Sequence, residues 1–314
     1  MIHTKIGATI YNVSTKGKFK EFIQELYDYG FRIFELYLPF YSVVNSDSTI
    51  NKTKVNEIKD VLSTFKTEEL SAHGYYDDEV NVISNPASVD ETTRKMAEKT
   101  LLSTLEICSE LNVHVLNEHP GTILPELKKS NSINVSFMVN NYERLGKPNA
   151  VKAAVRTIEN CAKAAEDNDV LICVENEVPR VDTLPIADNP LVIPTIVDAV
   201  GSEYVRATCD VGHLALSASF FGFDLLTSIR LLKPYIRHLH LHDNRLIPFP
   251  VGGTKLEKDL GDLHLPPGKG LIDFKGAIKC LDGVDAVYNL EVIRYKTLAD
   301  FKLSADFLRK LQSS

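Results

Sequence analysis

Histidines and carboxylates recur at the ends of successive apolar runs in this sequence of 314 residues. Nine of them form a set of candidate metal ligands: His73, His119, Glu175, Asp210, His213, His242, Asp262, His264 and Glu291. Buried charges are costly unless they are paired or bound to metal, so repeated charges at equivalent positions need a common cause. A cluster of divalent ions supplies that cause. Mixed imidazole and carboxylate ligands suit Zn, Mn, Co or Fe, and the lack of cysteine ligands disfavours a purely structural zinc site.

Side chains alternate along a strand, so residues of one parity share a face. The run YIRHLHLH therefore places His238, His240 and His242 together. Because His242 lies nearest the end of the run, we expect it to be the ligand, and His238 and His240 to be hydrogen-bonded interior residues. Glu35 has the inward parity of the second apolar run. It is expected either to contact a substrate or to belong to a buried ion pair.

A regular alternation of β-rich and amphipathic segments must position these residues. Strands are expected at 5–11, 31–38, 69–75, 112–119, 170–177, 204–210, 235–242 and 286–293. Helices are expected near 18–29, 51–67, 88–111, 148–167, 190–200, 224–232, 273–282 and 298–312. The third helix is expected to begin at Ser88, which forms a capping-box pattern with Glu91.

Eight β/α units of about 39 residues predict an α/β protein with the fold of a (β/α)8 TIM barrel. The length alone would also fit two domains, but no Gly/Ser-rich or Pro-rich linker interrupts the alternation. We therefore expect a single domain over residues 1–314. Active sites of such barrels lie at the carboxyl ends of the strands, where the candidate ligands recur. The long connection over 243–272 adds Asp262 and His264 to that face.

The order of the candidate ligands resembles the xylose isomerase-like TIM-barrel superfamily. His73, His119 and Glu175 are followed by CDVGH, HLHLHDN, an Asp-x-His element and Glu291. The resemblance runs along nearly the whole chain. This superfamily includes sugar and sugar-phosphate isomerases and epimerases, and also endonuclease IV. The resemblance therefore implies an enzyme that needs a divalent metal, either Zn, Mn or Co, with one to three ions.

The ketose epimerases of this superfamily imply specific roles. Their single catalytic metal is held by a Glu, an Asp, a His and a Glu, which match Glu175, Asp210, His242 and Glu291. By resemblance, Glu175 and Glu291 are also the catalytic acid and base. They would exchange a substrate proton on opposite faces while the metal stabilises an enediolate.

Three residues are candidate substrate contacts. His213 matches a family histidine that binds a substrate oxygen, and Glu35 faces the barrel interior. Arg245 lies near, but not at, the offset of the arginine that binds substrate in the epimerases. The resemblance predicts isomerisation or epimerisation of a small sugar or sugar phosphate.

Endonuclease IV is the alternative, because it carries three zinc ions in the same frame and all nine of its ligand types have candidates here. Abasic DNA must be entered by basic and wedge residues in loops. The loop LPFYSVVNSDSTIN (38–51) contains no Lys or Arg. The Asp-x-His element also occurs in sugar-isomerase-like relatives. We favour the isomerase branch and a small sugar as the partner, and abasic DNA stays open as the alternative.

Composition fits a globular protein. Hydrophobic residues make up 44% and charged residues 25%, and the net charge of −7 disfavours a duplex-binding surface. Five scattered cysteines suggest no disulfides and a cytoplasmic location. The sequence contains no long apolar run that would span a membrane, and its first residues show no secretory signal. The oligomeric state is left open.

Overall fold

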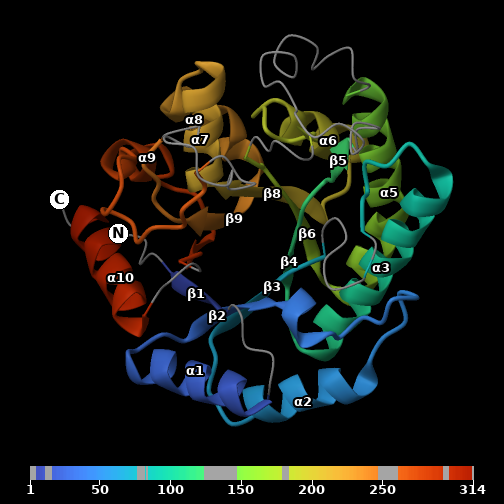
Figure 1. Ribbon diagram of the computed structural model, residues 1–314, viewed down its shortest axis with the longest axis horizontal. Coiled ribbons are helices and arrows are strands. Elements are labelled where there is room, and N and C mark those ends of the chain that lie inside the picture. The colour runs from blue at the N-terminus through green and yellow to red at the C-terminus, as the bar shows by residue number, and fades with distance from the viewer. Residues whose placement is uncertain are drawn as a thin grey trace, which may run out of the picture.

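The computed structural model describes residues 5–10, 16–75, 82, 84–123, 147–178, 184–246, 261–292 and 297–312. Eight parallel strands close into a barrel: β1 (Ile6–Ile10), β2 (Ile33–Tyr37), β3 (Glu69–His73), β4 (Val115–Glu118), β6 (Leu171–Glu175), β8 (Val205–Asp210), β9 (Ile236–Leu241) and β10 (Val287–Leu290). Their order around the barrel follows the chain, and β1 pairs with both β2 and β10 (Figure 1). The predicted (β/α)8 barrel is confirmed. The assignment of all 314 residues to one domain stays a prediction.

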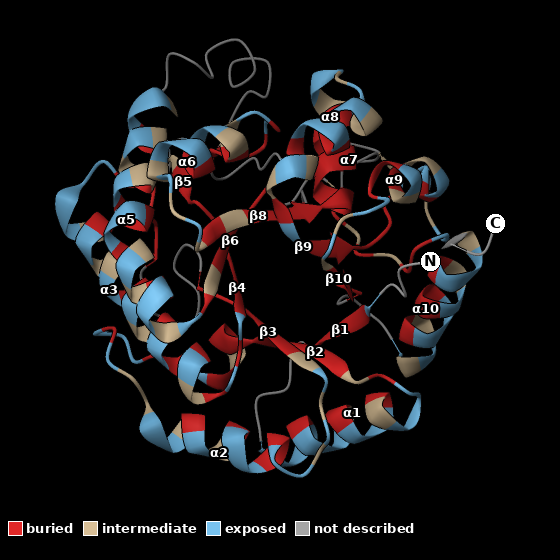
Figure 2. Cartoon of the chain, turned by 180° about the vertical axis from the view of Figure 1, so that it is seen from behind, coloured by how far each residue is buried: buried red, intermediate tan, exposed pale blue. Residues whose placement is uncertain are grey.

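Helices surround the barrel and turn their buried faces toward it (Figure 2). They are α1 (Lys16–Asp28), α2 (Lys52–Leu62), α3 (Glu91–Glu110), α5 (Lys147–Asn168), α6 (Val192–Val200), α7 (Val211–Phe221), α8 (Leu225–Leu232), α9 (Phe274–Cys280) and α10 (Leu298–Gln312). Two short strands, β5 (Thr122–Ile123) and β7 (Leu184–Pro185), pair with each other outside the barrel. In the described part of the chain, no helix is long and apolar enough to cross a membrane.

Local capping explains where several helices begin. The side chains of Asn51, Asp224 and Asp273 each accept a hydrogen bond from a backbone N–H in the first turn of α2, α8 and α9. The expectation for α3 was wrong: Asp90, not Ser88, caps this helix and accepts from the backbone N–H of Thr93. Ser88 instead accepts from the backbone N–H of Asp90, so it orders the turn before the helix.

Strand alternation separates two layers of buried side chains. Residues such as Phe34, Leu36 and Leu239 belong to the hydrophobic core between the barrel and the helices. The inner layer is polar, because Thr9, Glu35 and Ser71 are register partners on β1, β2 and β3. Each of these three is at most 3% exposed. A polar interior must be hydrogen-bonded, and this layer lies below the candidate ligands.

Candidate metal centre

All nine candidate ligands are buried, with at most 7% exposure. They fall into three adjacent groups, and within each group the ligand atoms lie within 4.8 Å of one another. The histidine pair group is His73, His119 and Glu175; the central group is Glu175, Asp210, His240 and Glu291; the outer group is His213, His242, Asp262 and His264. Glu175 belongs to the histidine pair group and the central group, and the 3.1 Å approach of His242 Nε2 to Asp210 joins the outer group to the central one. The structure therefore brings all nine predicted residues together and adds His240.

The central group converges on the Nδ1 atom of His240. This nitrogen lies 3.0 Å from Glu175 Oε1, 3.4 Å from Glu291 Oε2 and 3.8 Å from Asp210 Oδ2. Glu291 Oε2 is buried and makes no hydrogen bond within the part of the chain that the structure describes. Three buried carboxylates around one imidazole carry more negative charge than the imidazole can balance. The donor set therefore fits a divalent cation that prefers nitrogen and oxygen ligands.

The histidine pair group has the same character. His119 Nε2 lies 3.2 Å from His73 Nε2 and 3.1 Å from Glu175 Oε2. His73 Nδ1 is 3.0 Å from the carbonyl oxygen of Gly74, to which it donates when it carries the hydrogen. The lone pair of His73 then lies on Nε2, facing His119 and Glu175. Two imidazole nitrogens and a carboxylate oxygen thus point at one position.

The outer group is arranged around Asp262. Its Oδ2 lies 2.6 Å from His264 Nε2 and 3.6 Å from His213 Nε2, and its Oδ1 lies 3.7 Å from His242 Nδ1. The other nitrogen of His242, Nε2, is 3.1 Å from Asp210. His242 therefore connects the outer group to the central group. The family resemblance implies His242 as a ligand of the same ion as Glu175, Asp210 and Glu291, whereas here His240 is the imidazole grouped with these three carboxylates.

The motif CDVGH positions ligands through a helix start. Asp210 ends β8 and caps α7, accepting at 2.7 Å from the backbone N–H of His213. A Cβ atom on Gly212 would lie 2.1 Å from Cε1 of His242. Glycine is therefore required at this position for the imidazole of His242 to pack against the helix.

The motif HDN anchors the segment that carries Asp262 and His264. The carboxylate of Asp243 accepts from the backbone N–H groups of Gly268 and Gly270, at 2.9 and 2.8 Å. Asn244 Oδ1 accepts from the backbone N–H of Leu263 at 2.6 Å. His264 has a positive φ of 42°, a strained conformation for a residue with a side chain. These anchors hold the strained residue against the outer group.

The pKa values of the two glutamates in the central group are shifted in opposite directions. Burial raises the pKa of Glu175, but His240 and His119 outweigh it and hold that pKa well below its ordinary value. Burial, together with Glu175 and Asp210, raises the pKa of Glu291 to about 8. In the absence of an ion, Glu175 is therefore ionised at neutral pH while Glu291 retains a proton.

The pKa values of His73 and His119 are likewise shifted in opposite directions. Burial and the neighbouring His119 lower the pKa of His73 to about 4. Burial also lowers the pKa of His119, but the carboxylates of Glu175 and Glu177 outweigh it and raise it to about 10. One imidazole is neutral and the other charged at neutral pH without an ion, which explains their 3.2 Å approach.

The predicted substrate contacts lie at different depths. Glu35 is fully buried, and its Oε2 lies 2.7 Å from His238 Nε2 and 2.9 Å from His240 Nε2. Of the two roles expected for Glu35, substrate contact or buried ion pair, the structure shows the ion pair. Burial raises the pKa of Glu35, yet His240 and His238 hold it far below its ordinary value. His213 lies in the outer group, and Arg245 is exposed just beyond β9.

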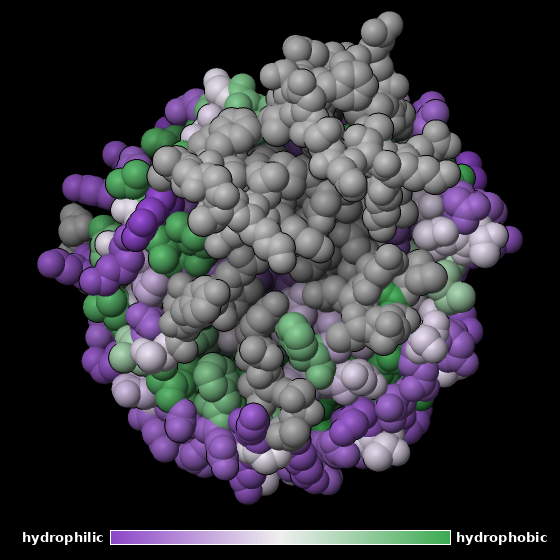
Figure 3. Space-filling view, viewed as in Figure 1, coloured by the Kyte–Doolittle hydropathy of each residue, from purple (hydrophilic) through white to green (hydrophobic). Residues whose placement is uncertain are grey.

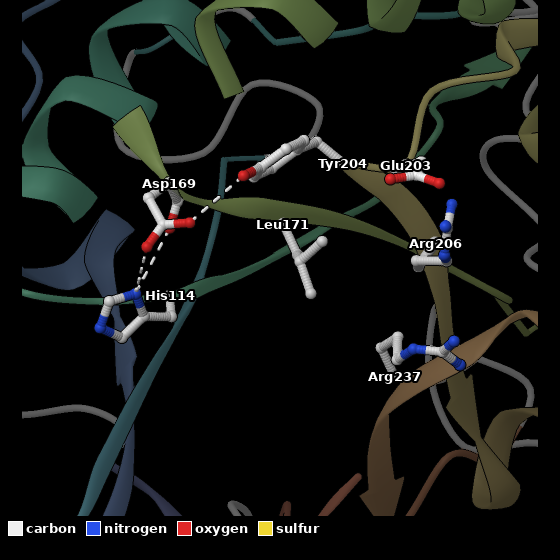
Figure 4. Close-up of a pocket in the computed structure, with 7 residues that line it drawn as sticks. All are labelled: His114, Asp169, Leu171, Glu203, Tyr204, Arg206 and Arg237. Carbon is white, nitrogen blue, oxygen red and sulfur yellow. Dashed lines mark hydrogen bonds and ion pairs between the residues drawn. The ribbon is translucent and has the colours of Figure 1, made fainter. Parts of the chain in front are cut away.

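An open cavity of about 420 Å³ lies at the opposite end of the barrel (Figure 4). It is lined by His114, Asp169, Leu171, Glu203, Tyr204, Arg206 and Arg237. Figure 4 shows His114 and Tyr204 both directed at Asp169. None of the nine candidate ligands lines it. On the face shown in Figure 3, the exposed side chains over α1 and α2 are predominantly hydrophilic.

A model of the xylose isomerase-like TIM barrel family matches residues 23–311. The chain therefore belongs to this family, which confirms the resemblance found in the sequence. An uncharacterized protein of Methanocaldococcus jannaschii is 27% identical over 228 residues, covering 72% of this chain and 66% of that protein. The match thus spans just under two thirds of that relative.

Several solved structures share the fold over nearly the whole chain. A D-tagatose 3-epimerase-like protein has a TM-score of 0.70 at 20% identity, covering 99% of this chain and 97% of that one. D-psicose 3-epimerase of Clostridium cellulolyticum H10, solved with D-tagatose, has a TM-score of 0.67 at 17% identity, covering 98% and 99%. 3-Keto-D-glucoside 4-epimerase of E. coli has a TM-score of 0.66 at 14% identity, covering 98% of this chain and 99% of that one.

Proposed function

We propose that this protein is a divalent-metal-dependent isomerase or epimerase of a small sugar or sugar phosphate. The observation that carries the proposal is the pair Glu175 and Glu291, two carboxyl groups in one candidate metal group with pKa values displaced in opposite directions. Paired carboxyl groups whose environments separate their pKa values are the arrangement that acid–base catalysis uses.

The central group can divide the work of proton transfer. Glu175, ionised and close to His240 and His119, and Glu291, once a bound ion has displaced its proton, offer two carboxylates that can accept a proton from a substrate carbon and return it. A divalent ion held by Glu175, Asp210, His240 and Glu291 would polarise adjacent substrate oxygens and acidify the neighbouring C–H bond. His213 and Arg245 are proposed as substrate contacts.

The solved structures support a small sugar as the substrate class. The three named above are epimerases, or epimerase-like, of tagatose, psicose and a keto-glucoside. The loop over 38–51 supports the same choice. Its backbone forms a bridge between Val44 and Ile50, and the hydroxyl of Tyr75 accepts from the N–H of Val44. Because the loop packs on the barrel and carries no basic residue, it is poorly suited to entering DNA.

A second candidate is a zinc-dependent phosphodiesterase of the endonuclease IV type. One observation favours it: ten buried ligand residues form three adjacent groups, more than a single ion needs. The number of bound ions therefore distinguishes the two candidates. We propose Zn, Mn or Co as the metal, with one ion expected for the isomerase and three zinc ions for the phosphodiesterase.

Solvent deuterium exchange tests the proposed function. The protein loaded with Mn²⁺ or Co²⁺ is incubated in D₂O with D-tagatose, D-psicose or D-fructose and their phosphates, and carbon-bound deuterium is measured by NMR. Glu291→Gln should lower the exchange rate about 100- to 10,000-fold, because it removes a proton donor. Glu203→Gln, the same change in the cavity at the other end, should leave the rate unchanged. Three bound zinc ions together with nicking of an abasic duplex would replace this proposal with the second candidate.

A further inference from the structure

The polar interior of the barrel contains a hydrogen-bonded chain that ends on the central group. Glu35 on β2 is fully buried, and one of its oxygens, Oε2, is shared by His238 Nε2 at 2.7 Å and His240 Nε2 at 2.9 Å. The other oxygen, Oε1, accepts from the hydroxyl of Thr9 at 3.1 Å. Asn289 donates in turn to the hydroxyl oxygen of Thr9, which directs the hydroxyl hydrogen to Glu35.

This arrangement fixes which nitrogen of His240 carries hydrogen. An ionised carboxylate can only accept hydrogen bonds, so each imidazole nitrogen that faces Glu35 Oε2 must be an N–H donor. A neutral imidazole has one N–H and one lone pair. A bound ion requires a neutral ring, and Nε2 keeps its hydrogen for Glu35, so the lone pair of His240 then lies on Nδ1, the atom that lies 3.0 Å from Glu175 and 3.4 Å from Glu291.

We infer that Glu35 is a positioning residue that sets the tautomer and orientation of His240 for metal binding. The inference rests on the proposed metal centre. Glu35 does not touch the position of the ion; it acts through the far side of the imidazole. Such outer carboxylates orient a ligating histidine and raise its basicity, and their loss commonly weakens metal binding about 10- to 100-fold.

Glu35, His238 and His240 are themselves close enough to hold an ion. A neutral His240 has a single lone pair and can serve only one of the two groups. The central group offers three carboxylates, whereas the group below offers Glu35 alone. The larger negative charge favours the ion in the central group, which leaves Glu35 as the hydrogen-bond acceptor.

Metal affinity, rather than activity, tests this inference. Dissociation constants for Co²⁺ are measured by competition with a chromophoric chelator in the wild type, Glu35→Gln and Glu118→Gln. Glu118 is the matched control, because it is a buried glutamate on the barrel strand β4 outside all the groups described above. Glu35→Gln should weaken binding about 10- to 100-fold and change the visible absorption of bound Co²⁺, whereas Glu118→Gln should change neither.

A measurement on the unaltered protein covers the case in which Glu35→Gln does not fold. In the protein loaded with Zn²⁺, ¹⁵N chemical shifts of the histidine rings should show His240 with hydrogen on Nε2 and the ion on Nδ1. The opposite tautomer would overturn the inference. Unchanged Co²⁺ affinity and spectrum in Glu35→Gln would also overturn it while leaving the proposed function intact. A wild-type protein that binds no divalent ion would overturn both.

Discussion

Charged side chains are buried at the carboxyl end of the barrel and largely exposed at the amino end. At the carboxyl end, the nine candidate ligands are at most 7% exposed, and their ligand atoms lie close to those of other members of the set. At the amino end, the side chains of His114 and Asp169 are 54% and 76% exposed. Arg206 there donates to the carbonyl oxygens of Ser202 and Val205, the backbone just before it.

The charged groups at the two ends therefore differ in how they interact with water and with one another. The amino-end charges keep most of their hydration, so each pair contributes little and each can be lost alone. The carboxyl-end carboxylates have lost their hydration and have too few donors among themselves, as the unsatisfied Glu291 Oε2 shows for the described residues. A bound cation would supply a partner for such a set, and barrel enzymes place their catalytic residues at this end.

The largest effect should come from replacing one carboxylate of the central group. Asp210 lies near His240 and His242, so it contacts two of the three groups. Asp210→Asn keeps an oxygen that can cap α7 but removes the charge. Because loss of an outer partner alone weakens binding about 10- to 100-fold, loss of this ligand should weaken Co²⁺ binding by more than about 100-fold.

Asp169→Asn is the matched change at the amino end, and Co²⁺ affinity should be unaffected by it. Both constants come from the same chelator competition. Equal affinities for the two variants would show that the carboxyl end does not hold the ion, and the contrast between the ends would lose its functional meaning.

The fold was predictable because strand and helix periodicities are local. All eight barrel strands lie within the ranges expected from sequence, but α7 was missed. That helix follows β8 without a connection, since Asp210 is both the last strand residue and the helix cap. Its sequence VGHLALSASFF has no polar stripe, because eight of its residues are buried, so no amphipathic pattern announces it.

The sequence predicted which residues of the candidate site lie together, but not how they are grouped. His238, His240 and His242 share one face, and spacing alone does not say which of them lies level with the carboxylates. That depends on register: Asp210 pairs with His240 across β8 and β9, after an irregularity between Ala207 and Thr208 shifts the alignment by one residue. Such a bulge is a tertiary feature without a sequence signal here.

The next effect is on pH dependence. Below about pH 8, Glu291 in the metal-free protein holds a proton, because burial and the neighbouring Glu175 and Asp210 raise its pKa. An incoming ion must displace that proton. Apparent affinity for Co²⁺ should therefore rise about tenfold per pH unit up to about pH 8, from this group alone, and that contribution should vanish above it.

Chelator competition between pH 6 and 9 measures this slope. Glu291→Gln should remove about one proton from it, since glutamine does not titrate. A slope that is the same in the variant and the wild type would show that Glu291 loses no proton when the ion binds, and that Glu291 is not a ligand of the ion.

The smallest effect should come from the amino-end pair itself. His114 Nδ1 lies 3.6 Å from Asp169 Oδ2, and both side chains are largely exposed. Asp169 has a positive φ of 54°, which asparagine also tolerates, so Asp169→Asn removes the charge without new backbone strain. The free energy of unfolding should fall by less than about 1 kcal/mol, and by less still at high salt, because exposed pairs are screened. Urea denaturation of the metal-free protein measures it, and a loss of several kcal/mol would mean that the amino end, too, depends on a buried charge network.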